Sequence, residues 1–189
     1  TRGAGIHVNF HPKDCDKIIY ASGTMIVVKS ISKPNDCFVY RGHSVTTTVA
    51  KFSPSGNWVA SGDSSGKVRV WAWDNPEHPA KLETHVFAGE VKDLDWDFEG
   101  TKICAVGTGN GTLAKTFFAD TGNATGEMVG HNKAVLAVAY KPSRPFRIAT
   151  ASEDMKTAFY EGPPFKFHHS NECHTNFVNC IRYSPNSEL

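Results

Sequence analysis

The chain repeats itself about every 44 residues, and this period constrains its fold more than any other feature. His43, His131 and His174 each open a similar segment, and Phe87 stands where a histidine would open the segment between the first two. The intervals 43 to 87, 87 to 131 and 131 to 174 are 44, 44 and 43 residues. Units of this length stack on their neighbours to build a common core.

Each segment has the internal pattern of a four-stranded antiparallel sheet. The strands predicted in the segment that opens at His43 are 45–52, 58–61, 67–71 and 82–87. The first of them is rich in β-branched residues, and the third alternates polar and apolar residues. A Gly-His near the start and a Trp near the end of such a unit are typical of WD-repeat blades. We therefore predict an all-β fold, a WD-repeat β-propeller.

The repeat boundaries place about four blades in this sequence. The expected repeats are 1–42, 43–86, 87–130 and 131–173, with a truncated repeat at 174–189. A seven-bladed propeller of such units needs roughly 300 residues, and closure of the ring protects its strand edges. Both ends of the sequence fall inside a repeat, so we expect 1–189 to be a partial arc of a seven-bladed propeller.

The histidine and tryptophan of each repeat are predicted to be structural. In WD repeats they join a hydroxyl and a turn carboxylate in a buried hydrogen-bond chain, which satisfies every polar group in it. His43, Ser61 and Trp71 fit this chain, with Asp63 or Ser65 at the acidic position. We expect these residues to hold a blade together and to take no part in catalysis.

The other two repeats depart from this set to different degrees. His131, Ser152, Asp154 and Tyr160 are expected to form a weaker version, because a phenol replaces the indole. The repeat at 87–130 lacks the set, since Phe87 replaces the histidine and Ala119-Asp120 stands where Trp-Asp is expected.

Composition and charge argue against several classes of function. The net charge is +1, and Lys and Arg are scattered along the chain, which argues against a nucleic-acid groove. No apolar run of 18 residues predicts a membrane span. Five irregularly spaced cysteines, several of them in apolar strand-like runs, favour buried free thiols over disulfides.

No constellation of residues in the sequence supports an enzyme, a metal site or a small-molecule substrate. Gly107–Gly111 lacks the phosphate-loop pattern and is expected to be a turn between two strands. His168, His169, Cys173 and His174 fit no common zinc spacing. Asp93, Asp95 and Asp97 alternate along a predicted strand, and we expect them to face solvent on one blade surface. No cofactor is expected.

The stretch EGPPFKF at 161–167 is the most distinctive part that does not repeat. Pro163 and Pro164 are stiff and should direct the residues that follow. If those residues are extended, Phe165 and Phe167 share a face and Lys166 points the other way. The rings then either anchor a protein interface or fill the groove between two blades while Lys166 is solvated.

With KPSRPFRIATASEDMKT at 141–157, FAGEVKDLDWDFEGTKICAVG at 87–107 and SGDSSGKVRVW at 61–71, this stretch resembles the actin-interacting protein 1 family. The resemblance covers essentially the whole chain in the same order, and EGPPFKF is its most specific part. WAWD and WDFEG are closer to the fungal members of the family. The family has two seven-bladed propellers, so the resemblance implies that this chain belongs to the N-terminal one.

The resemblance also implies a function. Members of the family bind actin filaments decorated with cofilin, promote their disassembly and restrain filament ends. The actin-facing residues of the family correspond to Glu153, Lys166, Phe167 and Phe177 of this sequence. From the residues alone, Glu153 could equally be an exposed turn residue and Phe177 a core residue of an inner strand. The implied location is the cytoplasmic actin cytoskeleton, and the alternative is a WD-repeat scaffold or adaptor for a ubiquitin-ligase or signalling complex.

One loop departs from the family pattern. The family usually carries a charged GEGR-type loop with an acidic contact, where this chain reads GTGNGTLAK at 107–115. No acidic residue remains there, which suggests a diverged member with altered affinity for filaments or simply a poorer sequence at this loop.

Overall fold

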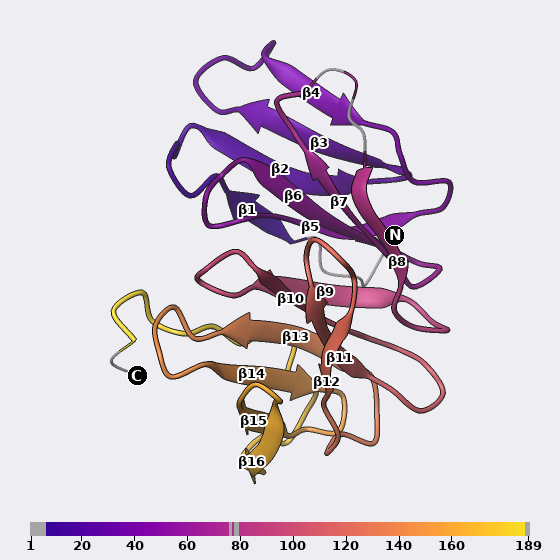
Figure 1. Cartoon of the computed structure of the whole chain (residues 1–189), viewed down its shortest axis with the longest axis vertical. Coiled ribbons are helices and arrows are strands. Elements are labelled where there is room, and N and C mark those ends of the chain that lie inside the picture. Colours follow the sequence, from indigo (N-terminus) through magenta and orange to yellow (C-terminus); the bar gives the residue numbers. More distant parts are fainter. Residues whose placement is uncertain (1–6, 76, 78–79, 188–189) are drawn as a thin grey trace.

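The computed structural model describes residues 7–75, 77 and 80–187, and in them the chain forms four four-stranded antiparallel sheets. Residues 1–6 of the first expected repeat and 188–189 of the last lie outside this description. Figure 1 shows the sheets stacked in chain order, from indigo for the first to orange for the fourth. The all-β fold of WD-repeat blades predicted from the sequence is confirmed.

Each sheet is one blade made of four consecutive strands. Blade 1 consists of β1 (Val8–Phe10), β2 (Lys17–Ser22), β3 (Met25–Ser30) and β4 (Cys37–Tyr40). Blade 2 consists of β5 (Thr47–Phe52), β6 (Trp58–Asp63), β7 (Lys67–Ala72) and β8 (Ala80–His85). Blade 3 consists of β9 (Val91–Trp96), β10 (Lys102–Gly107), β11 (Ala114–Phe118) and β12 (Ala124–Glu127). Blade 4 consists of β13 (Val135–Tyr140), β14 (Arg147–Ser152), β15 (Thr157–Glu161) and β16 (Lys166–Asn171).

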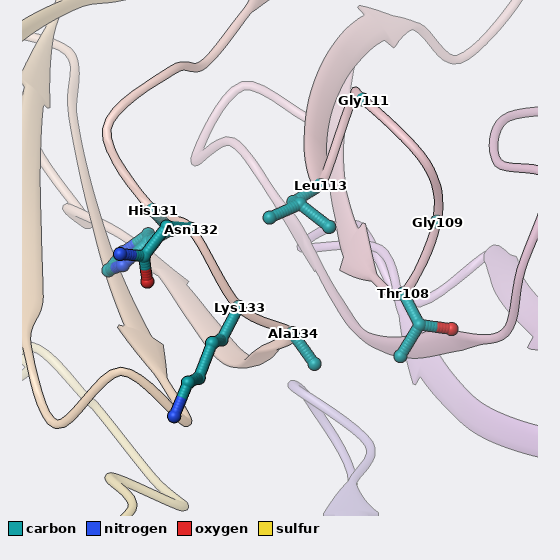
Figure 2. A pocket seen from close by; sticks show the side chains of 8 residues that line it. All are labelled: Thr108, Gly109, Gly111, Leu113, His131, Asn132, Lys133 and Ala134. Carbon is teal, nitrogen blue, oxygen red and sulfur yellow. The ribbon is translucent and has the colours of Figure 1, made fainter.

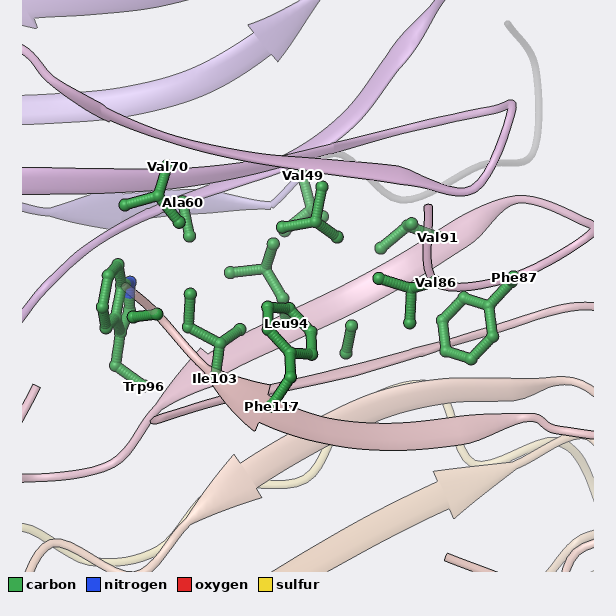
Figure 3. Packing of buried hydrophobic residues seen from close by; sticks show 13 residues of the cluster. Val49, Ala60, Val70, Val86, Phe87, Val91, Leu94, Trp96, Ile103 and Phe117 are labelled. Carbon is green, nitrogen blue, oxygen red and sulfur yellow. The ribbon is translucent and has the colours of Figure 1, made fainter. Parts of the chain in front are cut away.

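Apolar side chains fill the space between successive blades. Between blades 2 and 3, Val49 and Val70 face Leu94, Ile103 and Phe117, all of them at most 1% exposed (Figure 3). Similar clusters lie between blades 1 and 2 and between blades 3 and 4. Because strand side chains alternate between two faces, each blade contributes one apolar set to each neighbour. The core is therefore a series of layers between sheets.

The first strands of the blades, β1, β5, β9 and β13, lie side by side along the inner edge of the stack. Polar side chains bridge them. Asp93 Oδ2 accepts from the Val138 amide at 3.1 Å, and Asp95 Oδ2 accepts from the Tyr140 amide at 2.8 Å. The side chain of Asp95 also pairs with Lys51 Nζ of blade 2 at 3.0 Å.

The expectation that Asp93, Asp95 and Asp97 face solvent is therefore wrong. Asp93 and Asp97 are at most 1% exposed, and Asp97 accepts hydrogen bonds from Thr101 and Lys102 in the turn that follows its strand. The physical reason is that the inner strand of blade 4 has buried backbone amides that need acceptors, and Asp93 and Asp95 supply them.

The segment after β16 packs on the last blade without a strand of its own in the described residues. The Val178 amide donates to the Ser152 carbonyl at 3.2 Å, and Val178 packs with Ile181 against Ala137 and Ala151. In Figure 1 this segment, drawn in yellow, runs past β13 and β14.

The cysteines are free in the described residues, but most of them are not buried as the sequence suggested. Cys104 is buried between blades 3 and 4, and this burial raises the pKa of its thiol well above the ordinary value. Cys15, Cys37, Cys173 and Cys180 are exposed. Their apolar neighbours in sequence did not predict burial because they lie at strand edges and in connecting segments.

Candidate functional site

A buried hydrogen-bond chain ties the loops of blade 2 to its strands. Trp71 Nε1 donates to Ser61 Oγ at 3.1 Å, and Ser61 Oγ lies 2.8 Å from His43 Nε2. His43 Nδ1 lies 2.8 Å from Asp63 Oδ2. Since the hydroxyl receives the indole proton, it donates its own to Nε2, and Nδ1 then donates to the carboxylate. With a neutral imidazole, every polar group in this hydrogen-bond chain has a partner.

The charge states of this chain follow from its burial and its partners. Burial lowers the pKa of His43 in spite of the neighbouring Asp63 carboxylate, which keeps the ring neutral. Burial by itself would raise the pKa of the Asp63 carboxyl, but hydrogen bonds from Ser65 and His43 hold that pKa below its ordinary value. Asp63 therefore occupies the acidic position, and Ser65 donates to it at 2.6 Å. This hydrogen-bond chain is structural, because each of its polar groups is already hydrogen-bonded to another group of the blade.

Blade 4 has the same chain without its last member. His131 Nδ1 lies 2.9 Å from Asp154 Oδ2, and Nε2 lies 2.8 Å from Thr150 Oγ1. The hydroxyl partner predicted from the sequence, Ser152, is wrong, because its hydroxyl donates to the Ala134 carbonyl at 2.9 Å. One residue separates Ser61 from Asp63 in blade 2, whereas three residues separate Thr150 from Asp154 in blade 4. Ser152 has the spacing of blade 2 and was therefore predicted in place of Thr150.

Tyr160 occupies the place of the indole in blade 4 but does not complete the chain. Its hydroxyl is buried and has no hydrogen-bond partner of good geometry among the described residues. Burial raises the pKa of this phenol to about 12. The hydrogen-bond chain of blade 4 thus has one bond fewer than that of blade 2, because no indole N–H donates to the strand hydroxyl.

Blade 3 replaces the polar chain with apolar packing. Phe87, at the histidine position, is 3% exposed and belongs to the cluster between blades 2 and 3. Trp71 pairs with Val59 of the neighbouring strand β6, and Phe117 pairs with Ile103 of β10. Ile103 lies 44 positions after Val59, so the two pairs are equivalent in the repeat. Phe117, and not Ala119, is therefore the counterpart of the tryptophan. Figure 3 shows both phenylalanine rings in this layer.

The misplacement of that tryptophan position has a simple cause. The turn between the second and third strands spans 64–66 in blade 2, whereas the corresponding loop spans 108–113 in blade 3. Residues 108–111 of the Gly-rich tract lie in this loop, between two strands as the sequence predicted, and Gly107 is the last residue of β10. Its extra residues move every later position of the blade relative to the 44-residue period.

The two phenylalanines of the EGPPFKF stretch differ in burial. Phe165 is 3% exposed and packs in the cluster between blades 3 and 4, with its ring 5.7 Å from that of Tyr140. Phe167, at the start of β16, is 46% exposed and meets the ring of Tyr160 edge-on at 6.0 Å. The two alternatives left open by the sequence are thus divided: one ring fills the groove, and the other is available to a partner.

Phe167 lies against the connection from blade 3, next to a residue that the sequence did not single out. A Cβ atom at Gly130, whose φ is +134°, would lie 3.0 Å from the Phe167 ring, so glycine lets the ring approach this closely. Val129, the residue before it, is 72% exposed. Phe167 and Val129 together form an apolar surface at the rim between blades 3 and 4, which we term the rim patch.

Lys166 precedes the rim patch and is also exposed. It faces Glu161 across the β15–β16 pair, but Glu161 forms its ion pair with Arg147. In the described part of the chain, no acidic side chain lies within 4 Å of the Lys166 amine. The cation is therefore free to meet a partner.

Glu153 and Phe177 lie together at the opposite end of blade 4 from Lys166. Glu153 is in the β14–β15 turn, and its amide donates to the Ala134 carbonyl at 3.0 Å. Phe177 is 52% exposed and precedes Val178, which is bonded to Ser152 beside that turn. Between the turn and Lys166 lies the length of β15, roughly 16 Å. The four carried-over residues thus span the blade, with Lys166 and Phe167 at one end and Glu153 and Phe177 at the other.

A pocket of about 260 Å³ opens between blades 3 and 4, near Glu153. One wall is the β10–β11 loop, with Thr108, Gly109, Gly111 and Leu113 (Figure 2). The other wall is the segment 131–134 that leads into β13. Figure 2 shows the two walls facing each other, with the Lys133 side chain directed away from the β10–β11 loop.

The histidines near the C-terminus make no larger cluster. His168 Nδ1 and His169 Nδ1 lie 2.6 Å apart, and the second ring stacks on Phe159. The described residues contain no group of three or more potential metal ligands. These residues also contain no helix that is long and apolar enough to cross a bilayer.

Comparison with known proteins agrees with this architecture. The family model of the WD domain, G-beta repeat, matches residues 35–72 and 122–160. Each matched segment begins at the outer strand of one blade and ends in the third strand of the next. The chain is built of WD repeats.

Curated relatives match nearly the whole of this WD-repeat chain. Actin-interacting protein 1-2 of Arabidopsis thaliana is 45% identical over 97% of the chain, and WD repeat-containing protein 1 of Gallus gallus is 42% identical over 97%. Actin-interacting protein 1 of Drosophila melanogaster is 41% identical over 100%. The resemblance to the actin-interacting protein 1 family is confirmed. The WD-repeat chain spans about 30% of the length of these relatives.

Proposed function

We propose that the chain is part of an actin-filament-binding WD-repeat protein that cooperates with cofilin to promote filament disassembly and restrain filament ends. In this proposal the chain is a partial arc of the N-terminal propeller and acts in the cytoplasm, at the actin cytoskeleton. It works by binding energy and needs no catalytic group or cofactor. The observation that carries the proposal is identity of 41–45% to proteins named for actin interaction along 97–100% of the chain.

The surface chemistry of blade 4 supports this proposal. Phe167 and Phe177 are 46% and 52% exposed, although large aromatic side chains are usually buried. Lys166 lies beside the first ring, and Glu153 lies near the second. Interfaces favour aromatic anchors surrounded by charged and polar groups. Glu153, Lys166, Phe167 and Phe177 are therefore our proposed actin- and cofilin-binding residues, and Val129 extends the apolar part.

A double substitution in the full-length protein tests the proposal. Lys166→Ala combined with Phe167→Ala should weaken cosedimentation with cofilin-decorated actin filaments by about tenfold or more, since it removes an anchor and a charge. Both side chains are exposed, so the thermal unfolding temperature should stay close to that of the unaltered protein. The measurement is the fraction of protein pelleted as a function of filament concentration, with and without cofilin.

The matched control is Ile31→Ala combined with Lys33→Ala. These residues are also an exposed apolar side chain and an exposed lysine, but they lie in blade 1. This control should bind decorated filaments like the unaltered protein. Equal binding by both double variants, or sedimentation that does not depend on cofilin, would count against the proposal.

A WD-repeat scaffold or adaptor for another multiprotein complex is the second candidate. It rests on the repeats themselves and on relatives whose name refers only to those repeats. In that case pull-downs should recover partners other than actin, such as ubiquitin-ligase or signalling components. Filament disassembly would then be unchanged by the Lys166 and Phe167 substitutions.

A further inference from the structure

The β10–β11 loop contains an asparagine followed directly by a glycine, Asn110-Gly111, and this pair occurs once in the sequence. Both residues are exposed, and they lie in the irregular part of the chain between β10 and β11. Figure 2 shows Gly111 at a bend of this loop, which forms one wall of the pocket. An exposed Asn-Gly pair is chemically reactive, because the backbone nitrogen of the glycine can attack the side-chain carbonyl carbon of the asparagine.

The surroundings of Gly111 leave its nitrogen open to this reaction. Its amide donates no hydrogen bond to any described residue, so the reaction breaks no hydrogen bond of the fold. A glycine has no side chain that shields the nitrogen. A Cβ atom at Gly111 would have no neighbour within 4 Å, so there is space around the backbone for a new ring. The Asn110 side chain also makes no hydrogen bond within the described part of the chain.

Other exposed asparagines lack this combination. Asn57 is exposed in the β5–β6 turn, but the amide that follows it belongs to Trp58 and donates to Ser53 Oγ at 3.2 Å. The bulky indole also shields that nitrogen. Asn123 is exposed before β12, but the next residue, Ala124, has a side chain and is the first residue of that strand. The pair in the β10–β11 loop thus combines exposure, an unbonded amide and the absence of a side chain.

We propose that Asn110 is a site of spontaneous deamidation in the folded protein. The Gly111 nitrogen attacks Cγ of Asn110, its proton passes to the side-chain nitrogen, and ammonia leaves as a succinimide ring closes. Water then adds to either ring carbonyl and opens the ring, which gives an aspartate or an isoaspartate. No atom is oxidised or reduced, and at neutral pH the product has a carboxylate in place of the neutral amide.

This reaction changes the charge of a loop that has no acidic side chain. The chain has 20 Lys and Arg against 19 Asp and Glu, so one added carboxylate changes its net charge from +1 to 0. The new charge lies in the loop that faces segment 131–134 across the pocket. Isoaspartate in addition lengthens the backbone of the loop by one carbon atom. The inference goes beyond the proposed function and does not depend on it, because the reaction requires only the loop and water.

Peptide mapping of the full-length protein by mass spectrometry tests the proposal. Trypsin should release residues 103–115, in which Asn110 is the only side-chain amide, and residues 52–67, in which Asn57 is the only one. After the native protein is kept at mildly alkaline pH, the first peptide should gain the mass expected when NH2 is replaced by OH. The control peptide with Asn57 should gain it about tenfold more slowly or not at all. Isoaspartyl methyltransferase should transfer a labelled methyl group to the 103–115 peptide of the aged protein.

Two variants and an unfolded control complete the test. Asn110→Gln should show no mass gain in this peptide, because a glutamine would have to close a larger and slower ring. Gly111→Ala should slow the gain about tenfold, since a methyl group then shields the nitrogen. The rate in the native protein should lie within about tenfold of the rate in urea, because the loop is already exposed in the fold. A gain at Asn110 no faster than at Asn57, or a native rate further below the rate in urea, would overturn the proposal.

Discussion

At the scale of single residues, Ser61 illustrates how one small group can organise a blade. Its hydroxyl joins the Trp71 indole to His43, and through the imidazole to Asp63. All four side chains are at most 6% exposed, so no water replaces a lost partner at low cost. Blade 3 replaces the whole set with apolar side chains, Phe87 and Phe117 among them, and no buried polar side chain of its described residues lacks a partner.

We expect Ser61→Ala to destabilise the protein by about 2–4 kcal/mol, because it strands two buried groups, the indole N–H and the imidazole Nε2. The measurement is the free energy of unfolding in urea. Ser64→Ala, an exposed serine three residues away, is the control and should change that free energy by less than about 0.5 kcal/mol. A loss for Ser61→Ala no larger than the control would show that water repairs the chain.

At the scale of structural elements, β9 connects three blades through a single side chain. Asp95 pairs with Lys51 of β5 and accepts from the amide of Tyr140 in β13. The side chain is only 19% exposed, so both contacts lie in a partly buried environment. Inner strands are thus held together by side-chain-to-backbone bonds as well as by apolar packing.

Asp95→Ala should lower the free energy of unfolding by about 2–3 kcal/mol, since it leaves an amide and an ammonium without their acceptor. Asp95→Asn keeps one oxygen for the Tyr140 amide and should lose about half as much. Chemical denaturation of the two variants and the unaltered protein provides the comparison. Equal losses would mean that the ion pair with Lys51 carries the whole effect.

At the scale of the whole molecule, the WD repeats link the blades in sequence. The matched segments 35–72 and 122–160 run from an outer strand, β4 or β12, into the next blade. The face of blade 1 turned away from blade 2 carries Val8 and Phe10, which are 54% and 61% exposed. Apolar side chains on a sheet face are otherwise covered by a neighbouring sheet.

Expressed on its own, the 189-residue segment should therefore self-associate. Sedimentation velocity should show oligomers that increase with concentration, because Val8 and Phe10 expose apolar surface. Val8→Lys combined with Phe10→Lys should reduce this association. A monomer that melts in one sharp transition and does not respond to concentration would contradict the prediction.

The carried-over residues show where prediction from sequence reached its limit. The resemblance proposed Phe167 and Lys166 as binding residues but not Val129, which is exposed and precedes Gly130, the residue against which the Phe167 ring lies. Exposure is a tertiary property: Phe165 and Phe167 are two residues apart in one motif, yet only the second is accessible. Asp93 and Asp95 were misjudged for the same reason, because their partners lie about 45 residues away in the next blade.

The sequence by itself determined the blade. Alternation within strands, turn residues and the 44-residue period are local signals, so they predicted four-stranded units and the partners His43, Ser61 and Trp71. The tertiary structure alone decided which strand position Phe117 occupies and which acids are buried. These outcomes depend on loop length and on contacts between blades, and a repeat period carries no information about either.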